Sequence, residues 1–179
     1  MKNYRCYFSL LLCLFISVAT FAQKKSKYQI NGELFELPGK WEFRNQIKES
    51  GQFHLVNKKD SSSLLISVRK PENFEFYRDG ISDKELLNKF YQWESDYWSS
   101  SDGLQAEVSE ILRDQREKYI IWKILIKNIE SNNKDKISYL LYTVHHNKLI
   151  GITFSANSDR KISLTNEEAV AFLKKIDIK

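Results

Sequence analysis

Cysteine, methionine and proline are scarce in this chain of 179 residues, and their positions exclude several chemistries. The sequence has two cysteines, one methionine and two prolines. Both cysteines (Cys6 and Cys13) and the methionine lie within residues 1–22. A chain that has lost this segment has no thiol. Disulfides, thiolate metal sites, iron–sulfur clusters and cysteine nucleophiles are therefore excluded from the rest of the sequence.

Residues 1–22 have the pattern of a secretory signal peptide. Lys2 and Arg5 precede an apolar run over residues 6–21, and the segment has no acidic residue and ends at Ala22. A basic start, an apolar middle and a small residue at the cut are typical of such peptides. We expect cleavage after Ala22 and a periplasmic or secreted product. The run is shorter than the roughly 20 residues of a membrane-spanning helix, so we expect no membrane span after cleavage.

An excess of charge of one sign is lacking as well. Without Lys2 and Arg5, the chain has 26 lysines and arginines against 23 aspartates and glutamates, interleaved along its length. Nucleic-acid-binding proteins usually have a clear basic stripe. We therefore expect no nucleic-acid partner.

Motifs of common catalytic sites are missing. The sequence has no Gly-x-Ser-x-Gly motif and no glycine-rich phosphate loop. Glu94 and Asp96 form the densest acidic group, but two residues apart on a predicted helix they diverge, which indicates a solvated helix face. We expect no catalytic residue, no cofactor and no enzymatic activity.

The three histidines do not have the spacing of a metal site. His54 falls on the polar side of a predicted strand. His145 and His146 are adjacent at the end of a predicted hairpin, and neighbouring residues of a strand point to opposite faces. A third ligand at a familiar spacing is missing, so we expect no metal site.

Apolar residues at period two predict several half-buried antiparallel strands before residue 70. Polar segments at 48–51 and 57–61 separate them as turns. The alternating apolar positions are Trp41 and Phe43, then Phe53 and Leu55, then Leu64, Ile66 and Val68.

Two capping boxes predict two helices. Ser82 with Glu85 begins the first, which ends near residue 99, and Thr165 with Glu168 begins the second. The core-facing stripe of the first helix is Leu86, Phe90, Trp93 and Tyr97; that of the second is Ala169, Phe172, Leu173 and Ile176.

The remaining segments complete an α+β pattern. Residues 107–113 form a weak strand, residues 119–126 are apolar on both faces and predict a central strand covered on both sides, and residues 137–145 and 149–155 form a hairpin. We expect a largely antiparallel sheet of about six to seven strands with two main helices in a single-domain sandwich. This domain covers residues 28–179, and residues 23–27 precede it as a flexible leader.

The order of elements is similar to that of a known superfamily. A short strand leads into Leu37-Pro38-Gly39-Lys40-Trp41, and a helix, a long strand over residues 118–127, a hairpin and a last helix near Asn166 follow. This order resembles the PsbP-like, or Mog-one-like, α/β/α sandwich, including exported bacterial members of the DcrB type. The resemblance implies an accessory or binding protein. No metal- or partner-binding residue of that superfamily can be matched to a position here.

Aromatic residues, at 13% of the chain, are the feature that points to a function. Some lie off the predicted core stripe, where Trp, Tyr and Arg would suit a protein interface; the alternative is a loop packed over the sheet. We expect an exported, non-catalytic binding or accessory protein that contacts another protein of the cell envelope, with an immunity or inhibitor protein as one concrete version. A periplasmic carrier of a small apolar ligand is the alternative function. The predicted partner-binding residues are Phe74, Phe76, Tyr77, Arg78, Tyr91 and Trp98.

Overall fold

The computed structural model describes residues 25–48, 50–100, 105–116, 118–127, 135–156 and 164–179. The expected signal peptide and its cleavage site lie outside these residues. The first half of the chain forms β1 (Lys25–Ile30), β2 (Glu33–Pro38), β3 (Glu42–Ile47), β4 (Gln52–Val56), β5 (Ser63–Arg69), a short 3₁₀ helix η1 (Pro71–Asn73) and helix α2 (Asp83–Ser100). The second half forms β6 (Gln105–Arg113), β7 (Tyr119–Lys127), β8 (Lys136–His145), β9 (Lys148–Ser155), α3 (Asn166–Leu173) and β10 (Asp177–Ile178).

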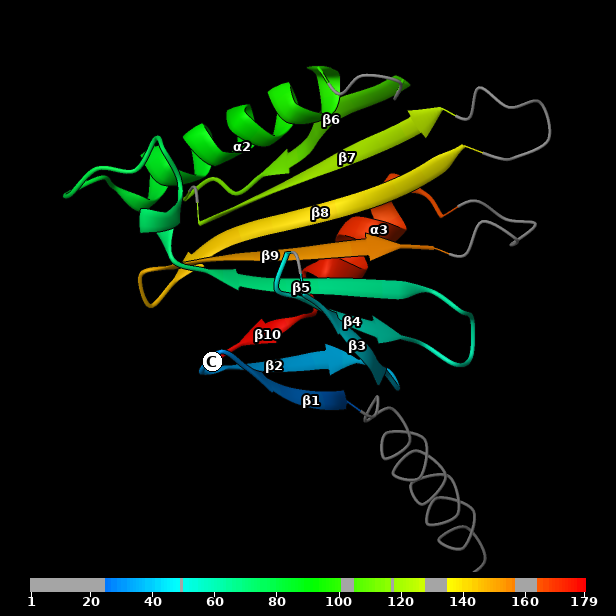
Figure 1. The fold of residues 1–179 in the computed structure, drawn as a ribbon. Helices are drawn as coiled ribbons and strands as arrows, with labels where there is room; N and C mark the ends of the chain where they lie inside the picture. Colours follow the sequence, from blue (N-terminus) through cyan, green and yellow to red (C-terminus); the bar gives the residue numbers. More distant parts are fainter. Residues whose placement is uncertain (1–24, 49, 101–104, 117, 128–134, 157–163) are drawn as a thin grey trace, which may run out of the picture.

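Seven of the strands form one antiparallel sheet, in the order β3-β4-β5-β9-β8-β7-β6. Helix α2 runs along the β6 and β7 end of this sheet, and α3 lies behind β8 and β9 (Figure 1). The predicted α+β sandwich with two main helices is therefore confirmed. The alternation that predicted strands before residue 70 also holds, since β3, β4 and β5 form a meander.

A second, smaller sheet has the order β1-β2-β10. The end of the chain is fixed here, because Lys179 exchanges two backbone hydrogen bonds with Leu34, at 2.9 and 3.0 Å. The flexible leader expected over residues 23–27 is wrong for its described part: residues 25–27 pair with residues 36–38 of β2. Period-two patterning missed residues 25–27 because Lys25, Ser26 and Lys27 are polar and none of them is buried.

The seven-stranded sheet lies between two cores, and β7 contributes side chains to both. Ile120, Trp122 and Ile124 point toward α2, while Ile121 points to the opposite face, where α3 and the small sheet pack. The expected covering of this strand on both sides is confirmed. It lies next to the edge strand β6 and not at the centre of the sheet.

Both helices begin where the capping signals in the sequence predict. The Thr165 side chain accepts from the Glu168 backbone N–H, and the Glu168 carboxylate accepts from the Thr165 N–H, so the capping box of α3 is complete. At α2, the Glu85 N–H donates to Ser82 Oγ at 3.2 Å. Among the described residues, neither helix combines the length and apolar character that crossing a membrane requires.

Candidate functional site

A row of aromatic side chains follows α2 and the segment before it. We call Phe74, Phe76, Trp93, Tyr97 and Trp98 the α2 aromatic row. Its rings contact one another in sequence, with centroid separations of 5.3 Å between Phe74 and Phe76, 5.6 Å between Phe74 and Trp93, 6.3 Å between Trp93 and Tyr97, and 5.6 Å between Tyr97 and Trp98. Such pairs stabilise one another and hold the rings in fixed orientations.

One side of the row packs on the core, and the other side faces solvent. Phe90, fully buried, contacts Phe74, Phe76 and Trp93 from the core side. Tyr97 is 57% exposed, and the other four members of the row are partly buried. The row is therefore rigidly packed on one side and accessible on the other.

The six predicted partner-binding residues fall into three places. Phe74, Phe76 and Trp98 belong to the row. Tyr77 and Arg78 lie just before α2, where Arg78 is exposed and donates to the Glu85 carboxylate at 3.0 Å. Tyr91 packs on Trp122 with ring centroids 5.0 Å apart.

The predicted core stripe of α2 is displaced toward neighbouring positions. Leu86, Leu87 and Phe90 are buried as a core requires, but Tyr97, expected inside, is exposed. Sequence reasoning therefore missed Trp93 and Tyr97 as members of the accessible row. The continuous apolar spacing gave no sign that the helix rotates them toward solvent.

Glu94 also departs from expectation. The sequence placed it on a solvated helix face, but its side chain lies under α2, with the Trp98 indole Nε1 3.5 Å from its carboxylate. Burial raises the pKa of Glu94 above its usual range, against the opposing influence of Tyr142, Trp98 and Arg69. Asp96, by contrast, is exposed and accepts from Gln92 at 2.8 Å.

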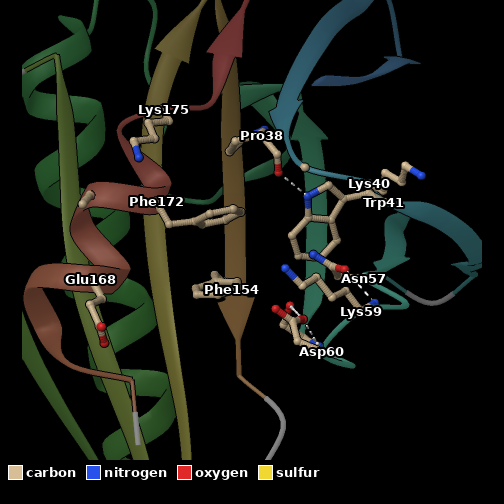
Figure 2. A pocket seen from close by; sticks show the side chains of 13 residues that line it. Pro38, Lys40, Trp41, Asn57, Lys59, Asp60, Phe154, Glu168, Phe172 and Lys175 are labelled. Carbon is tan, nitrogen blue, oxygen red and sulfur yellow. Dashed lines mark hydrogen bonds between the residues drawn. The ribbon is translucent and has the colours of Figure 1, made fainter. Parts of the chain in front are cut away.

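A concave region lies on the other face of the sheet, beside α3. This groove has a volume of about 610 Å³, which is within the range of small-molecule sites. The apolar wall of the groove consists of Trp41, Phe154 and Phe172 (Figure 2). The ring centroids are 6.5 Å apart in the Trp41–Phe154 pair and 4.4 Å apart in the Phe154–Phe172 pair. Trp41 is held by a hydrogen bond from its indole to the Pro38 carbonyl at 2.8 Å. Three lysines also line the groove: Lys40, Lys59 and Lys175.

A charged cluster joins the turn after β1 to the hairpin turn between β8 and β9. Glu33 is buried, and it accepts from Lys148 at 2.7 Å, from His145 at 2.9 Å and from His146 at 3.1 Å. Burial alone would raise the pKa of Glu33, but these hydrogen bonds outweigh it and hold the pKa at about 2. The expected divergence of His145 and His146 is wrong, because their ring centroids are only 3.9 Å apart.

The fold is similar to that of a solved structure. The solution structure of CyanoP, the cyanobacterial PsbP of Synechocystis, is 15% identical over 90% of this chain and 96% of that chain, with a TM-score of 0.53. The chain has a PsbP-like fold. LpqN of Mycobacterium tuberculosis, described as involved in cell envelope biogenesis, is 9% identical over 87% of this chain and 90% of its own, with a TM-score of 0.43. No protein-family profile and no curated protein sequence matches the chain.

Proposed function

We propose that the chain is an exported, non-catalytic accessory protein that binds another protein of the cell envelope through the α2 aromatic row. The observation that carries this proposal is Tyr97, which stands 57% exposed between Trp93 and Trp98. Tryptophan and tyrosine supply much of the binding energy of protein interfaces. A rigid aromatic surface also loses little conformational entropy on binding, because its rings are already ordered.

Neighbouring groups support an interface at this position. Arg78, beside the beginning of α2, is exposed and offers a charged rim to the aromatic centre. Interfaces commonly have this arrangement of apolar centre and polar edge. An immunity or inhibitor protein is one form that such a function takes.

The experiment compares two exposed aromatic residues. Tyr97 is 57% exposed on α2, and Phe43 is 54% exposed on β3, at the other edge of the seven-stranded sheet. The wild-type protein and the variants Tyr97→Ala and Phe43→Ala are each used to capture proteins from envelope and secreted fractions of the source cells.

We expect wild type and Phe43→Ala to retain the same protein at fixed stoichiometry, and Tyr97→Ala to lose it. Circular dichroism checks that all three baits are folded. Retention of that protein by Tyr97→Ala contradicts the proposed surface.

The groove beside α3 favours a second candidate function, that of a carrier of a small, mainly apolar ligand. Its aromatic wall would hold the apolar part. Three lysines line the groove against two carboxylates, Asp60 and Glu168, and this balance favours an acidic group on the ligand. Anilinonaphthalene sulfonate, an aromatic anion, is a suitable probe.

Ala171 lines the groove and is exposed on α3, so Ala171→Trp fills the groove at little cost to the fold. Lys174→Trp is its control. Lys174 is also exposed, at the end of α3, but it does not line the groove. A carrier predicts that the probe binds wild type and Lys174→Trp but not Ala171→Trp. Equal binding to all three proteins would exclude the groove as the site.

A further inference from the structure

Two hairpins that are distant in the sequence bring three metal-ligand side chains together. Glu33 lies at the start of β2, His145 is the last residue of β8, and His146 follows it in the turn to β9. One oxygen, Glu33 Oε2, is 2.9 Å from His145 Nδ1 and 3.1 Å from His146 Nδ1. One ligand atom from each residue lies within 4.8 Å of both others.

The backbone of the hairpin turn creates this convergence. His146 and Asn147 have positive φ angles of 47° and 57°, which is the left-handed geometry of a two-residue type I′ turn. Asn suits this conformation, and His is tolerated there more readily than most side chains. Because the chain reverses at His146, its imidazole swings to the same side as that of His145.

Neutralising Glu33 does not require two imidazoles. Lys148 already contacts the other carboxylate oxygen, Oε1, at 2.7 Å, and Lys148 also donates to the Asn31 carbonyl. Among the described residues, the two histidines are the hydrogen-bond partners of Oε2. The Glu33 side chain is 1% exposed, whereas that of His146 is 68% exposed, so the cluster has a buried base and an open solvent side.

We propose that Glu33, His145 and His146 bind one divalent cation of the zinc class. Two ligands of a tetrahedral Zn²⁺ site, each 2.0–2.1 Å from the metal, are about 3.3 Å apart, close to the two Glu33–histidine distances. Two imidazoles and a carboxylate, with no thiolate, suit Zn²⁺ and also Cu²⁺ or Ni²⁺. The fourth position faces solvent, where water or a side chain of a binding partner completes the coordination.

Binding requires a defined exchange of protons. Each imidazole must be neutral and present its Nδ1 lone pair to the ion, so the proton between Nδ1 and Oε2 leaves Nδ1 while Nε2 carries the one remaining proton: a neutral ring changes tautomer with no net loss, and a protonated ring releases one proton to solvent. Glu33 is already ionised, and Lys148 can remain on Oε1.

Calorimetric titration of the purified protein with Zn²⁺ alone at pH 7.5 tests the site. We expect one ion per chain, and at least a tenfold loss of affinity in His145→Ala and in His146→Asn. The second substitution removes the ligand but keeps a residue that accepts the left-handed turn. Glu33→Gln is a third test, provided that circular dichroism shows it folded.

Two variants serve as matched controls. His54→Ala removes the third histidine of the folded domain, which lies on β4 beside Asn45, and Asn147→Gly changes the same turn without removing a ligand. Both should bind Zn²⁺ as wild type does. The inference is overturned if folded wild type takes up no Zn²⁺ at millimolar concentration, or if His145→Ala and His146→Asn bind it undiminished. It is also overturned if these variants change only thermal stability, which would make the cluster a structural clasp.

Discussion

Substitution of Gly151 by alanine is a sharp test of how the α2 side of the sheet is packed. A Cβ atom added at Gly151 would lie 2.4 and 2.7 Å from two ring carbons of Tyr142 and 2.8 Å from Ser67 Oγ. Carbon atoms in contact are normally about 3.5–4.0 Å apart, so the Tyr142 ring must move by about 1 Å. Tyr142 stacks on Trp122 at 4.6 Å and contacts Phe90 at 4.5 Å, and both neighbours are fully buried.

The expected cost follows from two opposing effects. Forcing an extra methyl group into a packed core costs about 1–3 kcal/mol, and replacing glycine stabilises the protein by about 0.4–1 kcal/mol by restricting the unfolded chain. We expect Gly151→Ala to lower the free energy of unfolding by about 1–2 kcal/mol. Urea unfolding followed by tryptophan fluorescence should show a lower midpoint with an unchanged slope.

A double-mutant cycle identifies the clash. In a Tyr142→Leu background, we expect a smaller cost of Gly151→Ala, because the contacts with the ring are gone and only the contact with Ser67 Oγ remains. The packing account is refuted if Gly151→Ala is as stable as wild type, or if its cost is the same with and without the Tyr142 ring.

Two further predictions concern a helix cap and a buried carboxylate. Thr165→Ala breaks the capping box of α3 and should cost about 1 kcal/mol of unfolding free energy, measured by urea unfolding; a change below about 0.3 kcal/mol would contradict the role of the cap. Hydrogen bonds from Lys179, Lys25 and Lys27 lower the pKa of Glu36 from 4.5 to about 2, so its stabilising effect is complete above about pH 4.5 and is lost as the pH falls toward 2. Glu36→Gln should therefore reduce the dependence of the melting temperature on pH between 5 and 2, and an unaltered pH profile would exclude this carboxylate as a contributor.

The main sheet and both helices follow from local patterns in the sequence. Period-two alternation marks β3 to β5, and the Thr165–Glu168 box fixes the beginning of α3. The small sheet is less visible: β10 has two residues, too few for any periodicity, and Asp177 and Ile178 pair with Glu36 and Phe35, which are 141 and 143 positions away. Contacts of this kind depend on tertiary structure and not on local propensity.

The candidate sites were only partly predictable. Apolar spacing on α2 is compatible with several rotations of the helix, so it did not separate exposed Tyr97 from buried Leu87. Adjacent histidines diverge in a regular strand, and only the left-handed backbone of His146 brings them onto Glu33. The acidic partner is 112 residues from His145, a separation that no local spacing rule covers.

The central claim, that the α2 aromatic row contacts another protein of the envelope, can be tested directly in the source cells. A photo-crosslinking phenylalanine derivative would replace Tyr97 in one strain and Phe43, which is exposed to a similar degree, in another. After irradiation, we predict one crosslinked species of defined mass from position 97 and none of that mass from position 43. Absence of a crosslink at position 97, or the same crosslink from both positions, would contradict the account.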